Sequence, residues 1–133
     1  MPLDHMTLTV PQAKLEDIIK FLTTSLQPLG FKEMMRPLPN IVGLGDTAPL
    51  FWLNTHDGDA ETQEALFKKA HIAFTATSAE QVRQFYAAAL KAGATCNGPP
   101  GLRTQYHPGY YGAFVHEPVL GINIEVVSHN GDN

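Results

Sequence analysis

Two histidines and a glutamate are the residues of this sequence best suited to hold a metal ion. His5 opens the segment "HMTLTV", His71 opens "HIAFTATSAEQVRQFYAAALKAGA", and Glu125 lies within "INIEVV" near the end of the chain. Two imidazoles and one carboxylate bind Fe(II), Mn(II), Ni(II) or Zn(II) and leave coordination positions open for a substrate. Because the three residues are far apart in the sequence, only the fold can bring them together.

Each of these residues also has a simpler interpretation. A histidine at the start of a strand is often just a polar residue with a hydrogen-bond partner. Glu125 shares a strand face with Asn123, opposite Ile124 and Val126, if the segment alternates as a strand does. A glutamate there is costly unless it is paired, hydrated or bound to a cation, or unless the strand lies at the edge of a sheet with that face in water.

The elements that carry the two histidines form an internal repeat. Each histidine begins a short alternating run typical of a strand, and an apolar stripe at helical spacing follows it. The first helix is predicted over residues 12–26. The second begins at Ser78, with Gln81 spaced as in a capping box, and ends at Gly93.

Three strands are predicted after each helix, and the two halves are therefore alike. They span residues 31–36, 40–44 and 50–54 in the first half and 94–97, 111–116 and 122–129 in the second. The acidic segment between the halves, "THDGDAETQEALFKK", is predicted to be a linker with a single helical turn. A repeat of this size decides the fold class: α+β, with two βαβββ modules at about 1–58 and 69–129.

Composition excludes several classes of partner. The 133-residue chain has a formal net charge of -4, and its nine basic residues are scattered, which argues against binding to nucleic acid or to anionic membranes. No apolar stretch approaches the ~18–20 residues of a membrane span. The single cysteine allows no internal disulfide, and the first residues lack the pattern of a signal peptide, so a cytoplasmic location is expected.

The sequence resembles the vicinal oxygen chelate superfamily over nearly its full length. The resemblance is carried by "LDHMTLTV", "HIAFTATSAEQVRQFYAAALKAGA", "YHPGYYGAFVHEP" and "NIEVV". The superfamily groups glyoxalase I, extradiol dioxygenases, bleomycin and fosfomycin resistance proteins and methylmalonyl-CoA epimerase. The resemblance implies paired modules whose curved sheets enclose a cleft, a homodimer, and a divalent metal ion held by His5, His71 and Glu125.

One departure from the superfamily pattern bears on the reaction. Glyoxalase I has a fourth protein ligand, a glutamate, on the strand that ends the first module. The equivalent residue here is Trp52, whose indole cannot bind a metal. The resemblance therefore favours the three-ligand pattern of the extradiol dioxygenases, although lyase or isomerase chemistry stays open if water takes the fourth position.

Further candidate residues surround this proposed site. Trp52 is expected to stack on a planar ligand or to pack in the core. In the loop-rich segment "NGPPGLRTQYHPGYYGAF", Tyr106 and Tyr110 are candidate substrate contacts, and Arg103 either binds a substrate carboxylate or lies in solvent. His107 is a candidate general acid or base, since imidazole titrates near neutral pH, or part of a rigid connection.

Two functions are compatible with these residues. The first is a metal-dependent enzyme whose small substrate is chelated through two oxygens, with the metal neutralising the negative charge that develops in the reaction. Glu125 and His107 would then be its catalytic residues, and dioxygenase-type chemistry is favoured over that of glyoxalase I. The second is a metal-free, drug-sequestering type of binding protein in which Trp52 and the loop tyrosines line an aromatic pocket.

Overall fold

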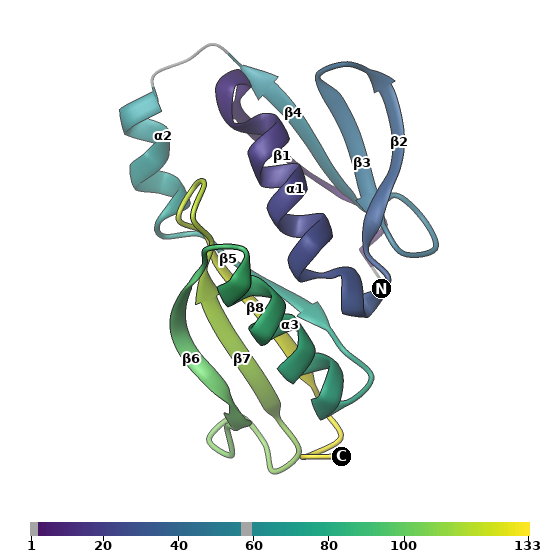
Figure 1. Ribbon diagram of the computed structural model, residues 1–133, viewed down its shortest axis with the longest axis vertical. Helices are drawn as coiled ribbons and strands as arrows, with labels where there is room; N and C mark the ends of the chain where they lie inside the picture. The colour runs from purple at the N-terminus through teal and green to yellow at the C-terminus, as the bar shows by residue number, and fades with distance from the viewer. Residues whose placement is uncertain (1–2, 57–59) are drawn as a thin grey trace.

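The predicted repeat is present in the computed structural model, which describes residues 3–56 and 60–133. Two four-stranded sheets have the equivalent strand orders β1-β4-β3-β2 and β5-β8-β7-β6 (Figure 1). In each sheet the first and last strands of the module pair in parallel, and the other pairs are antiparallel. The α+β class with two βαβββ modules is thus confirmed. The strands are β1 (Met6–Pro11), β2 (Lys32–Leu38), β3 (Ile41–Gly45), β4 (Phe51–His56), β5 (His71–Thr75), β6 (Thr95–Leu102), β7 (Tyr111–His116) and β8 (Asn123–Ser128).

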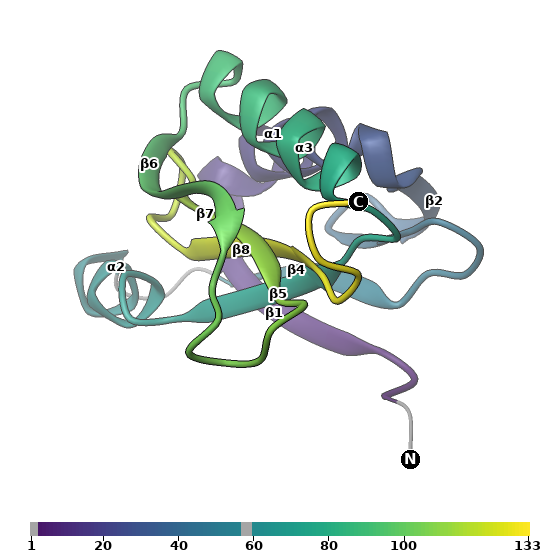
Figure 2. The same ribbon diagram turned by 90° about the horizontal axis from the view of Figure 1, so that it is seen from below.

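One long helix covers each sheet. The first is α1 (Leu15–Ser25), with a 3-10 turn at either end, and the second is α3 (Ala79–Lys91). The hydroxyl of Ser78 accepts a hydrogen bond from the Gln81 amide at 3.3 Å, which confirms the predicted cap. Both helices lie on the same side of the two sheets and pack against one another (Figure 2). The opposite face of each sheet is therefore free of α1 and α3.

A shared aromatic cluster holds the two modules together. The ring of Phe31, which precedes β2, lies 5.5 Å from that of Phe74 on β5 and 6.2 Å from that of Phe51 on β4. Both contacts are edge-on, an arrangement that aromatic rings prefer. A second link is polar, because the Lys14 ammonium donates to the Val119 carbonyl at 3.1 Å. These contacts join the two modules, together with the packing of α1 against α3.

Two elements differ from the sequence-based prediction. The segment expected to be a linker with a single turn contains α2 (Ala60–Phe67), an eight-residue helix of good helix formers. Strand β6 continues beyond residue 97 through Pro99 and Pro100 to Leu102. Prolines are tolerated there because β6 is an edge strand, and its pairing with β7 shifts register around Gly98. Among the described residues, no helix has the length and apolar character needed to cross a membrane.

Candidate functional site

A buried carboxylate and an exposed imidazole meet on the face of the second sheet opposite α3. The Nε2 atom of His71 lies 2.9 Å from Oε2 of Glu125. The side chain of Glu125 is only 3% exposed, whereas that of His71 is 43% exposed. Strand β8 pairs with both β5 and β7, so Glu125 lies in the interior of the sheet. The interpretation of Glu125 as a water-exposed residue of an edge strand is therefore wrong.

The second oxygen of this carboxylate is also engaged. The hydroxyl of Tyr110 donates a short hydrogen bond to Oε1 of Glu125. Gly112 makes room for this contact, since a Cβ at that position would lie 3.2 Å from Oε1 and 3.3 Å from the Tyr110 ring. Burial, reinforced by the hydrogen bond to Glu125 and its negative charge, raises the pKa of Tyr110 well above its usual range. The phenol therefore stays protonated at neutral pH and acts as a donor.

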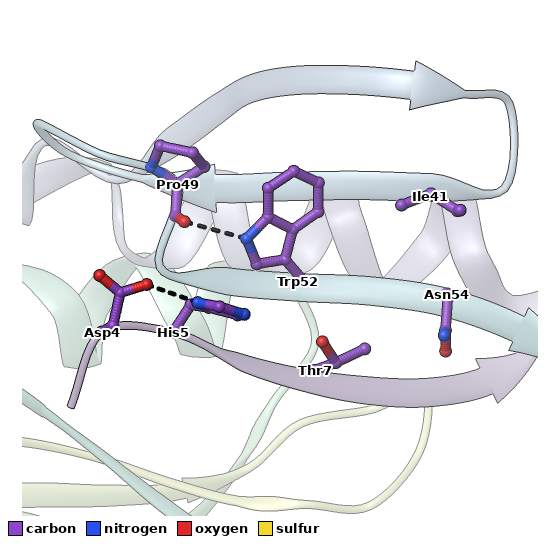
Figure 3. Close-up of a pocket in the computed structure, with 7 residues that line it drawn as sticks. All are labelled: Asp4, His5, Thr7, Ile41, Pro49, Trp52 and Asn54. Carbon is purple, nitrogen blue, oxygen red and sulfur yellow. Dashed lines mark hydrogen bonds and ion pairs between the residues drawn. The ribbon is translucent and has the colours of Figure 1, made fainter.

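The face of the first sheet opposite α1 carries a different site, a cavity of about 350 Å³. His5, Thr7 and Trp52 line it, together with four other residues (Figure 3). The indole N–H of Trp52 donates to the Pro49 carbonyl at 2.9 Å, which fixes the ring in the cavity wall. His5 Nδ1 lies 2.5 Å from the carboxylate of Asp4. This cavity places an aromatic plane beside a histidine. The four other residues are Asp4, Ile41, Pro49 and Asn54.

Strand register shows that Trp52 is the counterpart of Glu125. Trp52 is paired with Thr7, two residues after His5, and Glu125 is paired with Ala73, two residues after His71. The two positions are therefore equivalent in the repeat. The first module therefore has an indole at the position where the second has a carboxylate.

The structure brings two of the three predicted metal ligands together within one chain. His71 and Glu125 share a face of the second sheet, whereas His5 lies on the first sheet and contacts Asp4. Within the part of a single chain that the structure describes, no three His, Cys, Asp or Glu side chains are grouped to hold a metal ion. The three-ligand site therefore stays a prediction.

The loop between β6 and β7 is tied to the C-terminal segment through a histidine pair. His107 Nε2 lies 2.8 Å from Nδ1 of His129, and the amide of Gly109 donates to His107 Nδ1 at 3.0 Å. Since Nδ1 of His107 is an acceptor, Nε2 carries the proton and donates to His129. Both ring nitrogens of His107 are thus engaged, and its acid–base role stays a prediction. The sequence offered no signal for the partner, His129, because the contact joins two segments 22 residues apart.

The remaining predicted residues lie around Tyr110. The Tyr106 ring is 4.8 Å from that of Tyr110, although the Tyr106 side chain is largely exposed. The Arg103 guanidinium lies 5.5 Å from the ring centre of Phe114, which in turn stacks on His71 at 6.0 Å. Phe114 was not predicted as a site residue, yet it pairs with Glu125 in the sheet register. Alternation along β7 was the one sequence signal that could have placed it there.

Comparison with known proteins finds similarity at the level of structure. No family model matches the sequence, and no curated protein matches it. A glyoxalase/bleomycin resistance protein from Albidiferax ferrireducens T118 is similar with a TM-score of 0.69 and 24% identity, over 94% of this chain and 96% of that one. A glyoxalase/bleomycin resistance protein/dioxygenase family enzyme from Burkholderia phytofirmans PsJN has a TM-score of 0.69 and 20% identity, over 96% and 98% of the two chains.

A third similar structure contains a metal ion. It is a mutant of the fosfomycin resistance protein FosX from Listeria monocytogenes, in complex with Mn(II) and 1S,2S-dihydroxypropylphosphonic acid. Its TM-score is 0.65 and its identity 18%, over 94% of this chain and 87% of that one. These likenesses confirm the resemblance drawn from the sequence at the level of fold. The chain has the fold of the glyoxalase/bleomycin resistance/dioxygenase proteins, the vicinal oxygen chelate superfamily.

Proposed function

We propose that the chain is a metal-dependent enzyme of the glyoxalase/dioxygenase type, acting on a small substrate bound through two oxygen atoms. The observation that carries this proposal is the buried Glu125 carboxylate with a His71 nitrogen 2.9 Å from one of its oxygens. Nitrogen and carboxylate ligands lie about 2.0–2.2 Å from a metal such as zinc, so two atoms this close can bind the same cation. The donor set therefore fits a divalent metal.

The third ligand in this proposal is His5 from a second copy of the chain. Within one chain His5 lies on the other sheet, with its imidazole at the rim of the Trp52 cavity. If the face of the first sheet opposite α1 in one copy lies against the face of the second sheet opposite α3 in another, His5 joins the partner's His71 and Glu125. A homodimer arranged in this way has two equivalent sites.

The edges of the two sheets favour such an association. The outer edge strands β2 and β6 contain Pro37, Pro99 and Pro100, and both pair with their neighbours through register shifts. Prolines and irregular pairing protect an edge strand from joining another sheet. The other edge strands, β1 and β5, have continuous register and carry no Lys, Arg, Asp or Glu, and their one proline, Pro11, is the last residue of β1. We therefore place the contact between copies at β1 and β5.

The reaction type follows from Trp52. With an indole at the position equivalent to Glu125, the site has three protein ligands and leaves several positions for substrate oxygens, which favours dioxygenase-type chemistry. A bound divalent metal supplies Lewis acidity that neutralises developing negative charge on those oxygens. Trp52 offers its ring to a planar substrate beside His5. Tyr110, protonated at neutral pH, holds the Glu125 carboxylate in place.

Metal content tests this proposal directly. We expect protein purified without a chelator or a histidine tag to contain about one Fe, Mn, Ni or Zn per chain by elemental mass spectrometry. The metal should be lost in His71→Ala and in Glu125→Gln. His116→Ala is the matched control, since His116 contacts the Gly121 carbonyl rather than Glu125. A wild-type protein that binds none of the four ions, even after incubation with each, would contradict the proposal.

A second function is favoured by one specific observation. Both oxygens of Glu125 already accept hydrogen bonds from side chains, so the buried carboxylate is satisfied without a cation. The chain would then be a metal-free binding protein that holds its ligand against Trp52. In that case ligand binding persists in the presence of a chelator and in Glu125→Gln, and it is lost in Trp52→Ala. Metal dependence of binding separates the two functions.

A further inference from the structure

The second sheet carries a preformed cationic group beside the His71–Glu125 pair. The guanidinium carbon of Arg103 lies 5.5 Å from the centre of the Phe114 ring, and the His71 imidazole stacks on the same ring at 6.0 Å. Phe114 is paired with Glu125 in the antiparallel register of β7 and β8. Arg103, His71 and Glu125 are therefore neighbours around one aromatic side chain.

Two glycines of β6 form a cradle for this guanidinium. A Cβ on Gly98 would lie 3.1 Å from one terminal nitrogen of Arg103, and a Cβ on Gly101 would lie 3.0 Å from the other. The first of these nitrogens also donates to the Pro99 carbonyl at 2.6 Å. The side chain is thus held along the strand, and little conformational freedom is left to lose when a ligand binds.

Within the described part of the chain, Arg103 differs from Arg36 in having no carboxylate partner, a feature that it shares with Arg83. Arg36 forms ion pairs with Glu16 and Glu33, each at 2.8 Å, and Arg83 donates to the hydroxyl of Tyr111. Among the described residues, no carboxylate forms an ion pair with Arg103.

We propose that Arg103 binds an anionic group of the substrate, a carboxylate or a phosphonate, while the substrate's two chelating oxygens lie toward His71 and Glu125. A guanidinium has five donors in a planar fork that matches either anion in a bidentate fashion. One donor is used by Pro99, which leaves others for the ligand. The position of the chelating oxygens rests on the proposed function, whereas the anion site itself does not. The substrate class is therefore a chelating acid rather than a neutral diol.

Direct observation of the arginine side chains tests the anion site without any metal. In the ¹⁵N-labelled full chain, the Nε–H signals of the three arginines are followed during titration with acetate and with methylphosphonate. We expect the Arg103 signal to shift and saturate, and the preferred anion distinguishes a carboxylate from a phosphonate. Arg36 and Arg83 are internal controls. If the Arg103 signal does not move, or moves no more than the other two, the proposal is overturned.

A second experiment tests whether the anion site and the metal site bind the same substrate. Wild-type protein loaded with Mn(II) is titrated with 3,4-dihydroxybenzoate and with its uncharged amide. We expect the acid to bind at least about 10-fold more tightly, equivalent to about 1.4 kcal/mol. Arg103→Gln should abolish this preference, and Arg103→Lys should keep part of it, because lysine retains the charge without the fork.

The outcomes separate the two proposals. If Mn(II) binds but the acid has no advantage over the amide, the assignment of Arg103 to the substrate is wrong and the metal site stands. If Mn(II) does not bind to the wild-type chain, the proposed function fails, and the titration with acetate and methylphosphonate alone decides whether Arg103 is an anion site.

Discussion

The two modules share a backbone arrangement and differ in the side chains that line their faces. In the first, a large residue on the last strand, Trp52, is paired with a small one on the neighbouring strand, Gly43. In the second, Glu125 is paired with the large Phe114. A Cβ on Gly43 would lie 2.9 Å from the indole ring. The glycine therefore allows the Trp52 ring to lie close against the backbone of β3.

Because of this exchange of large and small residues, the two modules present different chemical groups on these faces. The first module provides an aromatic surface and one histidine around a cavity of about 350 Å³. The second provides the polar network, in which Glu125 accepts hydrogen bonds from His71 and Tyr110. The two histidines occupy equivalent positions in the repeat, whereas the residues paired two positions further along, Trp52 and Glu125, differ. Neither module supplies all three ligands of the proposed metal site, so the proposed enzyme needs both.

The largest expected effect concerns metal affinity. Glu125→Gln removes the charged ligand but keeps the size of the side chain, and we expect the affinity for Mn(II) to fall by about 100-fold or more, beyond the effect typical of outer-sphere residues. Trp52→Gln, at the equivalent position of the first module, should leave the affinity nearly unchanged. Equilibrium dialysis against Mn(II) measures both. Equal losses of Mn(II) affinity in the two variants would contradict the claim that only the second module's residue at this position binds the metal.

A glycine substitution tests how tightly the first module is packed. Gly43→Ala places a methyl group 2.9 Å from both Pro49 Cβ and the Trp52 ring, and overpacking of this kind costs about 1–3 kcal/mol. Gly112→Ala in the second module meets Glu125 and Tyr110 at 3.2–3.3 Å and should cost less. Urea unfolding measures both. A larger loss of stability in Gly112→Ala than in Gly43→Ala would contradict the claim that the first module is packed more tightly at this position.

Loss of the Tyr110 hydroxyl should weaken the second module's site. Tyr110→Phe leaves one oxygen of a buried carboxylate without its donor, and we expect the affinity for Mn(II) to fall by about 10-fold, as is typical when a hydrogen bond to a metal ligand is lost. Tyr106→Phe is the matched control, because Tyr106 contacts the Tyr110 ring without bonding to Glu125. Isothermal titration with Mn(II) measures this effect. Identical Mn(II) affinities for Tyr110→Phe and the wild type would show that the Tyr110 hydroxyl does not position Glu125 for metal binding.

The smallest effect is expected at the ion pair of the first module. A hydrogen bond from Arg36 lowers the pKa of Glu16 below its ordinary value of 4.5. Because the folded-state pKa is depressed, the pair's stabilisation is present above pH 4.5 and is lost as the pH falls through the folded-state value. Glu16 is exposed, so Glu16→Gln should change the free energy of unfolding by less than about 0.5 kcal/mol at pH 7. Urea unfolding at pH 7 and pH 3 checks both statements.

Much of this architecture could be predicted from the sequence, because strand alternation, helical stripes and the Ser78 cap are local patterns. The equivalence of Trp52 and Glu125 needed the strand register, because the resemblance to the superfamily only aligned Trp52 with the fourth ligand of glyoxalase I. Helix α2 was missed because its polar composition has no apolar stripe to reveal it. The bond from Tyr110 to Glu125 and the His107–His129 pair join segments whose approach depends on the tertiary fold. Local patterns also could not predict how the two modules are placed relative to one another. They therefore could not predict that His5 and His71 are separated within one chain.

The central claim is that the site forms between two copies of the chain, and mixing two defective variants tests it most directly. His5→Ala and Glu125→Gln should each fail to bind metal alone. After the two are unfolded and refolded together, random pairing makes about half of the dimers mixed, and each mixed dimer regains one of its two sites. About a quarter of all the sites should therefore bind Mn(II). No recovery of binding, despite mixed dimers in the sample, would contradict this claim.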